Sequence, residues 1–239
     1  MIELHTWTTQ NARKVAIMLE ECGLDYHIRP VNLLKNEQKT PEFIKRFANG
    51  RIPAIVDHLE DGKEIAIFES GAILLYLAEK TDRFLPTDIV ARSEIIQWLF
   101  WQMSALGPVM GNFAHFAAAI APDADYVNDY LRMTRSDNVL EYPISRFLTE
   151  SMRLLGVLES QLKEKDYIVE NYSIADMACF TWVESSWAGF CVSNPDFEKQ
   201  FSGIKSWMER IASRPSVAKV MEQFGWNSEL TETSGSFKI

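Results

Sequence analysis

Residues 49–80, NGRIPAIVDHLEDGKEIAIFESGAILLYLAEK, decide the fold of the first third of the chain. An Ile-Pro bond opens this stretch, and Asp61-Gly62 then separates two short apolar runs in the manner of a hairpin. Glu69-Ser70 follows directly before a strongly apolar helical segment. The order strand, hairpin, strand and helix is expected to bring a proline-flanked strand and a helix N-terminus to one edge of a sheet.

Such an edge suits a small peptide with a free carboxylate. An extended peptide can pair with the backbone beside the proline, and the positive end of a helix dipole favours an anion. Both features also have plain structural explanations, because proline is common on edge strands and serine is a favoured N-cap. The residues alone leave both explanations open.

Three segments before this stretch show regular periodicity: strand-like alternation at residues 2–6 and 26–31, and helical spacing at residues 11–22 that ends at Gly23. Thr40-Pro41 is typical of a helix start, and we expect the short helix that follows to face inward with Phe43, Ile44 and Phe47. The resulting order, βαβ, a helical connection and then ββα, is that of a thioredoxin-like domain. We place this α/β domain at residues 1–81 and a linker at residues 82–88.

Residues 89–226 carry only long, aromatic-rich helical patterns and are expected to form an all-α bundle. We expect interruptions at Gly107-Pro108 and at Pro143. Ser173 and Asp176 resemble a capping box in which aspartate replaces the usual glutamate. Residues 227–239 are polar and are predicted to be a tail without a core.

The composition excludes several classes of protein. The chain has 239 residues, 47% hydrophobic content and a net charge of −9, which indicates a packed globule and argues against nonspecific nucleic-acid binding. The three cysteines stand singly, which fits a reducing compartment, and the four histidines lack metal-ligand spacing. No apolar run is long enough to span a bilayer, and MIELHTW does not resemble a signal peptide. We therefore expect a cytoplasmic protein without a metal or a membrane partner.

The turn between the first strand and the first helix, Thr8-Thr9-Gln10-Asn11, contains no cysteine, and Cys22 lies a full helix away. In thioredoxins this turn holds the reactive thiolate. Here it offers only hydroxyl, amide and backbone N–H groups, which can lower the pKa of a thiol that a ligand brings. The ordinary alternative is a Thr/Asn helix entry. Arg13 and Lys14, which follow, are expected on a solvated face.

Four motifs carry a resemblance to a known family: IPAIVDH at 52–58, FESGAILLYLAEK at 68–80, WLFWQ at 98–102 and YSIADMACF at 172–180. Residues 2–215 resemble the cytosolic glutathione transferases, and within them the bacterial nu class and the relatives of the fungal nitrogen-regulator prion. The resemblance implies a homodimer that binds glutathione or glutathione disulfide. It also implies thiol–disulfide oxidoreductase activity on a small disulfide.

The resemblance assigns roles to particular residues. Thr9 and Asn11 would stabilise the glutathione thiolate, and the remaining contacts to glutathione would come from Gln38, Arg51, Ile52, Pro53, Glu69, Ser70 and Arg146. The Ile52-Pro53 bond is expected to be cis. Residues 127–142 look like an insertion, which puts the alignment of Arg146 in question.

The second-substrate pocket is expected to draw on Trp7, Leu106, Met110, His115 and Trp182. Two alternatives remain. The chain could conjugate glutathione to an electrophile, or it could be a transferase-like scaffold with a regulatory role. The chain lacks the Asn/Gln-rich N-terminal extension of the prion relatives, which argues against that mode of regulation.

Overall fold

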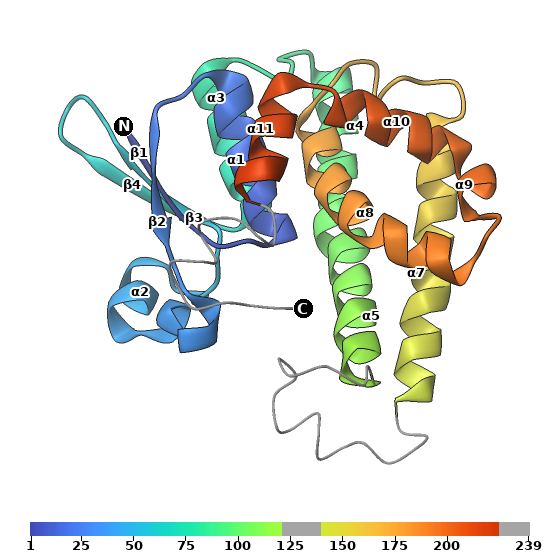
Figure 1. Cartoon of the computed structure of the whole chain (residues 1–239). Coiled ribbons are helices and arrows are strands. Elements are labelled where there is room, and N and C mark those ends of the chain that lie inside the picture. Colours follow the sequence, from blue (N-terminus) through green and yellow to red (C-terminus); the bar gives the residue numbers. More distant parts are fainter. Residues whose placement is uncertain (121–139, 225–239) are drawn as a thin grey trace.

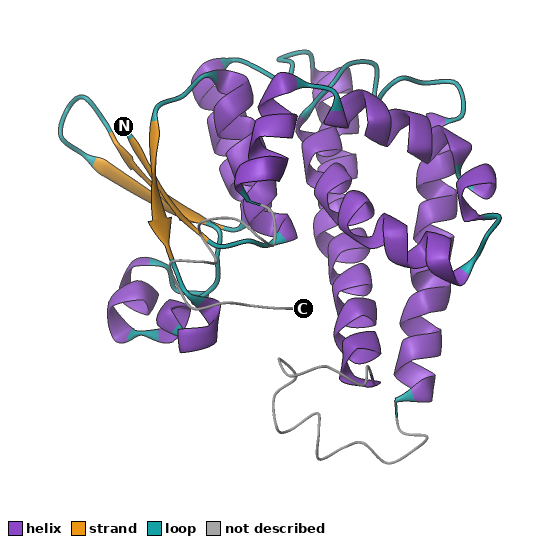
Figure 2. Cartoon of the chain, in the orientation of Figure 1, coloured by secondary structure: helices purple, strands orange, loops and turns teal. Residues whose placement is uncertain are grey.

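The computed structural model describes residues 1–120 and 140–224. Its sheet has the strand order β2-β1-β3-β4 and is formed by β1 (Ile2–Thr6), β2 (Tyr26–Pro30), β3 (Ala54–His58) and β4 (Glu64–Phe68) (Figure 2). β1 runs parallel to β2 and antiparallel to β3, and β3 pairs with β4 across the predicted hairpin. The parallel pair needs a crossover connection, which α1 (Gln10–Cys22) provides.

The two faces of the sheet bury different elements. Ile2, Leu4 and Ile55 point into the main core, where α1 packs against α3 (Ser70–Thr81) (Figure 1). Ala54 and Val56 alternate to the other face, as strand geometry requires, and contact Phe47. Phe47 directly follows α2 (Pro41–Arg46), a helix that begins at the predicted Thr40 cap.

One inward-facing prediction for α2 is wrong. Phe47 is 1% exposed and Phe43 is half-buried, but Ile44 is 40% exposed. Positions 43 and 47 lie four residues apart on one face of the helix, so the neighbouring position 44 is rotated away from the sheet. A single short helix can bury only one of its faces.

The bundle begins with α4 (Ile89–Trp101) and α5 (Gly107–Ile120), which are joined by a π-helical turn, η3 (Gln102–Leu106). The structure places the interruption expected at Gly107-Pro108 slightly earlier, in the π turn that ends at Leu106, directly before Gly107. The other described helices of the bundle are α7 (Glu141–Leu162), α8 (Ile174–Ser193), α9 (Phe197–Gln200), α10 (Ser202–Ala212) and α11 (Pro215–Gln223). α5 and α7 lie side by side (Figure 1).

The predicted start of α8 is confirmed. Ser173 and Asp176 form a capping box, and the buried Asp176 carboxylate also accepts hydrogen bonds of 2.9 Å from the Ile168 N–H and from the indole of Trp207. Burial raises the pKa of Asp176 to about 6. These bonds tie the α7–α8 connection to α10 and fix the central helix against which α1 packs.

Two predictions for the bundle lie wholly or largely outside the described residues: the insertion at 127–142 and the tail at 227–239. α7 begins at Glu141, so Pro143 stands in the first turn of the helix, where its missing N–H leaves no hydrogen bond unmade. Among the helices at 1–120 and 140–224, none combines the length and apolar character that a bilayer span needs.

Candidate functional site

A cavity of about 700 Å³ lies between the start of α1, the start of α3 and the helices η3, α5 and α8. It brings together six residues that the sequence singled out: Asn11, Arg51, Glu69, Ser70, His115 and Trp182. The first four belong to the α/β domain, and the last two belong to the bundle. The cavity is therefore built by both parts of the chain.

Asn11 is held in one orientation by a residue of the bundle. The indole Nε1–H of Trp182 donates a hydrogen bond of 2.9 Å to Asn11 Oδ1. An indole N–H can only donate, so the atom of Asn11 that it contacts must be the amide oxygen. The amide NH₂ of Asn11 is consequently left to donate to a ligand at the N-terminal end of α1, where the helix dipole also favours negative charge.

Thr9 is the N-cap of α1 and is not part of the cavity lining. Its Oγ1 accepts a hydrogen bond of 3.3 Å from the Ala12 N–H, and its own N–H donates to the Trp7 carbonyl at 2.9 Å. Only its hydroxyl hydrogen remains to serve a ligand. The ordinary helix-entry explanation therefore applies to Thr9 more fully than to Asn11.

Glu69 and Ser70 shape the second half of the cavity. Glu69 occupies the N-cap position of α3 with φ 72° and ψ 115°, a strained conformation for a residue other than glycine, and its carboxylate accepts a hydrogen bond of 2.8 Å from Asn49 Nδ2. Ser70 is the first helical residue and is buried. Its hydroxyl caps no helix N–H and, within the described part of the chain, approaches only the Met103 thioether, at 3.7 Å. No side chain of the described residues caps α3, so its first N–H groups can receive an anion.

The Ile52-Pro53 bond is cis, as predicted. Ile52 precedes β3, and neither its N–H nor its C=O forms a hydrogen bond with another described residue. This backbone can therefore pair with an extended ligand. Arg51 is exposed at the cavity, whereas Gln38 does not line it, although the Gln38 Oε1 is buried without a partner in the described ranges.

Three residues predicted for the second-substrate pocket are instead core residues: Trp7, Leu106 and Met110 are 6%, 0% and 1% exposed and do not line the cavity. The π turn explains the errors at Leu106, the last residue of η3, and at Met110 on α5. It inserts one residue into the helix, so the face that Leu106 and Met110 would occupy in an unbroken helix belongs to Gly107 and Gly111.

Arg146 does not join the other predicted residues. It is exposed on α7 and lines a separate cavity of about 520 Å³ together with Val109 of α5. Sequence position placed Arg146 correctly on a helix of the bundle but gave no measure of its distance from the sheet edge.

Sequence reasoning also missed three polar residues of the cavity, Lys14, Gln102 and Asn112. Lys14, expected on a solvated face, is 1% exposed, and its Nζ donates a hydrogen bond of 2.7 Å to Gln102 Oε1. A signal for Lys14 was available, because it lies three residues after Asn11 and so shares a helical face with it. The signal for Gln102 is weaker: it is one polar residue within an apolar helix.

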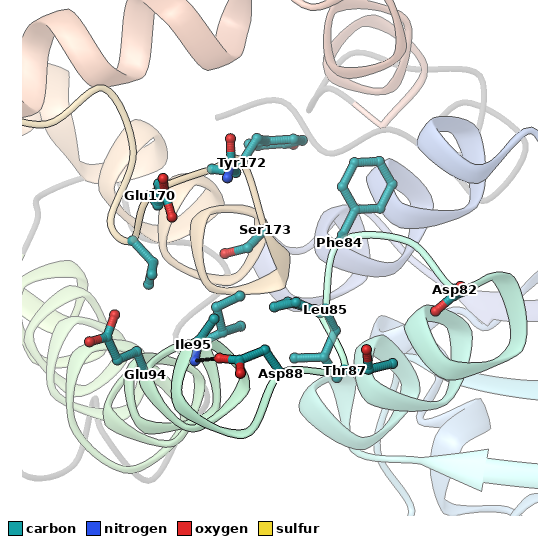
Figure 3. Close-up of a pocket in the computed structure, with 14 residues that line it drawn as sticks. Asp82, Phe84, Leu85, Thr87, Asp88, Glu94, Ile95, Glu170, Tyr172 and Ser173 are labelled. Carbon is teal, nitrogen blue, oxygen red and sulfur yellow. Dashed lines mark hydrogen bonds between the residues drawn. The ribbon is translucent and has the colours of Figure 1, made fainter.

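A further cavity, of about 540 Å³, lies at the linker between the two domains (Figure 3). Its side chains include four carboxylates, those of Asp82, Asp88, Glu94 and Glu170, and no Lys or Arg among the described residues. Asp88 caps α4 through hydrogen bonds from the Val90 and Ala91 N–H groups. None of the predicted site residues is present, and the acidic lining would repel a carboxylate. The cavity at Asn11 is therefore the better candidate.

Within residues 1–120 and 140–224, no group of three or more His, Cys, Asp or Glu side chains is arranged to hold a metal ion. The three cysteines are free, and the only one that is fully buried, Cys179, lies in the core of α8. The polar groups that line the cavity at Asn11 include amides, a hydroxyl, an ammonium, a guanidinium, an imidazole and a carboxylate.

Comparison with known proteins supports this architecture. Residues 2–79 match the glutathione S-transferase N-terminal domain, and residues 144–215 match the C-terminal domain of the same family. The chain is 40% identical over 224 residues to the disulfide-bond oxidoreductase YfcG of Escherichia coli, covering 92% of this chain and 94% of the relative.

Two solved structures are similar throughout. The glutathione transferase from Pseudomonas putida, with one glutathione disulfide bound per subunit, has 36% identity and a TM-score of 0.79 over 92% of this chain and 90% of that chain. The glutathione transferase URE2P6 from Phanerochaete chrysosporium, in complex with oxidised glutathione, has 32% identity and a TM-score of 0.78 over 93% and 96%. The fold is thus a thioredoxin-like domain joined to a helical bundle. The chain belongs to the glutathione S-transferase family.

Proposed function

We propose that this chain is a glutathione-dependent thiol–disulfide oxidoreductase that binds glutathione or glutathione disulfide in the cavity lined by Asn11, Glu69 and Ser70. The observation that carries the proposal is the Asn11 amide, which Trp182 holds with its NH₂ available at the positive end of α1. The disulfide-bond oxidoreductase name of the E. coli relative and the glutathione disulfide in the P. putida structure support the same reaction.

The residues around the cavity fit the groups of the tripeptide. The Ser70 hydroxyl and the N–H groups at the start of α3 would receive the γ-glutamyl carboxylate, and Glu69 would pair with the ammonium. The Ile52 backbone would pair with the cysteinyl unit as an added strand. Arg51 and Gln38 are the groups proposed for the glycyl carboxylate. Arg146, which lies in another cavity, has no part in this proposal.

Once glutathione is bound, Asn11 NH₂ and the Thr9 hydroxyl would donate to its sulfur. Hydrogen bonds and a dipole that favour the thiolate lower the pKa of the thiol, so more of the reactive form is present at neutral pH. The thiolate forms a new S–S bond with one sulfur of the substrate, while the old S–S bond breaks and leaves its electron pair on the departing sulfur. The protein supplies position and electrostatic stabilisation, and the nucleophile is the sulfur of glutathione.

A binding measurement with matched serine variants tests this assignment. Calorimetry with glutathione disulfide should show binding to the wild-type protein and affinity about tenfold weaker for Ser70→Ala, because a hydrogen bond to a charged group is lost. Ser160→Ala is the control, since the Ser160 hydroxyl only donates to the Gly156 carbonyl of its own helix. A wild-type protein that binds neither glutathione nor its disulfide would instead be a scaffold.

We also propose that the protein is a cytoplasmic homodimer. Three apolar side chains of α4 are strongly exposed in the single chain, with Ile89 at 72%, Val90 at 65% and Phe100 at 61%. Positions 89 and 100 lie three helical turns apart on one face, and a second copy is the occupant proposed for this face. Light scattering on wild type and Phe100→Glu tests the assembly: the wild type should have the mass of two chains. The three free cysteines fit a reducing compartment.

A further inference from the structure

Lys14 is a buried cation without a counter-charge among residues 1–120 and 140–224. It lines the cavity beside Asn11 on α1, yet it is only 1% exposed. Its Nζ donates to the neutral Gln102 Oε1 at 2.7 Å, and no carboxylate in the described ranges lies within ion-pairing distance. An ammonium in this position is costly, so it either gives up its proton or gains an anion from the cavity.

The charged groups nearest to Lys14 do not neutralise it. Burial lowers the pKa of Lys14 to about 7, and Glu69 and Cys179 act weakly in the opposite direction. Burial raises the pKa of Cys179, which therefore stays a neutral thiol. Glu69 is engaged by Asn49. The remaining cation of the cavity lining, Arg51, is exposed to solvent.

Other charges on the surrounding helices have partners elsewhere. On α1 itself, Arg13 donates to the Phe224 carbonyl at 3.1 Å and pairs with Glu184 of α8 at 3.5 Å. On α11, Lys219 pairs with Glu20. On α3, Lys80 pairs with Asp57 at 2.6 Å. None of these groups supplies Lys14 with a counter-charge.

Gln102, the hydrogen-bond partner of Lys14, also has a donor available for a ligand. It is 0% exposed and lines the cavity, and its Nε2 has no hydrogen-bond partner among the residues that the structure describes. A buried amide donor without a hydrogen-bond partner is unfavourable unless a ligand accepts its hydrogen bond. Asn11, Lys14 and Gln102 therefore present donors to the same space, where an anionic sulfur would satisfy them.

We propose that Lys14 is the proton carrier of the thiol–disulfide exchange: its neutral amine takes the proton of the glutathione thiol, and the resulting ammonium returns a proton to the sulfur that leaves. This inference rests on the proposed function. In the first step the S–H bond breaks and an N–H bond forms at Nζ. After the exchange of S–S bonds, the departing sulfur takes that proton and Lys14 is neutral again. Glutathione and the substrate disulfide are the only reactants.

A proton count during binding tests the proposal. At about one pH unit above the pKa of Lys14, glutathione is titrated into the protein in buffers of different ionisation enthalpy, and thiolate formation is followed by ultraviolet absorbance. S-methylglutathione, which has no ionisable thiol, gives the baseline. We expect the wild-type protein to form thiolate while releasing far less than one proton per thiolate, because the proton stays on Lys14.

The Lys14→Met variant should release one proton to the buffer for each thiolate that it forms. Arg13→Met is the matched control, because Arg13 is a buried cation of the same helical turn that faces away from the cavity, and it should behave as the wild type. Release of a full proton per thiolate by the wild-type protein overturns the role of Lys14 and leaves the proposed function intact. Absence of thiolate in the wild-type complex overturns the proposed function itself. Because both of these outcomes are measured on the wild-type protein, the role of Lys14 can be rejected even if a variant folds poorly.

Discussion

Trp182 and Asn11 are 171 residues apart in the chain and are joined by a hydrogen bond of 2.9 Å from the indole Nε1 to the amide Oδ1. The bond crosses from the helical bundle to the first turn of α1 in the α/β domain. Since it selects one of the two orientations of the Asn11 amide, the bundle determines which atoms of the thioredoxin-like turn face the ligand.

Removal of the Trp182 N–H should therefore weaken catalysis without removing glutathione binding. In Trp182→Phe the Asn11 amide can turn over, and we expect kcat/KM for glutathione-dependent reduction of a small disulfide to fall about 5- to 10-fold, the worth of one hydrogen bond. Trp187→Phe makes the same substitution on α8, where the indole reaches only Glu198 at 3.5 Å, and should retain wild-type activity. Equal activity of both variants would contradict the orienting role of Trp182.

Changes at Asn11 itself should have larger effects. Asn11→Ala removes a donor to a charged sulfur, worth about 1.5–3 kcal/mol, and should lower kcat/KM roughly 10- to 100-fold. Asn11→Asp should be worse still, because a carboxylate repels the thiolate. Thr9→Ser keeps both the hydroxyl and the helix cap and serves as the conservative control. Steady-state rates across a pH series would show the bound thiol titrating higher in both Asn11 variants, and an unchanged profile would rule out their contact with sulfur.

Gly111→Ala should lower activity through its contact with Trp182. A Cβ at this position would lie 3.0 Å from the Trp182 ring, so Gly111→Ala should displace the indole from Asn11 and reduce disulfide reduction. Replacement of a helical glycine by alanine otherwise stabilises a helix by about 0.5–1 kcal/mol. Gly156→Ala on α7 is the control, since a Cβ there meets nothing within 4 Å. We expect this control to melt at a higher temperature with full activity, and a fully active Gly111→Ala would show that the indole has room to move.

The lowered pKa of Lys14 predicts a pH dependence of stability. Lysine has a pKa of about 10.4 in an unfolded chain, against about 7 for the folded ligand-free protein, so the unfolded state binds more protons between these values. The free energy of unfolding should therefore rise with pH across this window, by up to about 1.4 kcal/mol per pH unit from this group. Urea titrations of wild type and Lys14→Met isolate the effect, because the other groups titrate in both. Parallel pH curves would mean that Lys14 is not perturbed.

Local patterns were sufficient for most of the fold. The X-Pro strand, the Asp-Gly hairpin, the Thr40-Pro41 helix start and the Ser173–Asp176 capping box each depend on residues within a few positions of one another, and the structure contains all of them. Such patterns carry their own physical cause in backbone geometry and capping. Glu69, Ser70 and the cis Ile52-Pro53 bond belong to the same local stretch, which explains why they were found together.

The errors at Leu106, Met110 and Lys14 share one origin, the phase and packing of long helices. A π turn at Gln102–Leu106 exchanges Leu106 and Met110 for Gly107 and Gly111 on the cavity face, and no local rule places that inserted residue. Lys14 looked like a surface lysine because its burial depends on η3, 88 residues away.

The sequence by itself determined the two kinds of secondary structure, the sheet-edge stretch at 49–80 and the lack of a cysteine in the turn at residues 8–11. Only the tertiary structure decided which side chains share the cavity, how the Asn11 amide is oriented and that Lys14 is buried. Periodicity and capping are set by neighbours along the chain, whereas burial, hydrogen-bond partners and the electrostatic environment are set by residues that folding brings close.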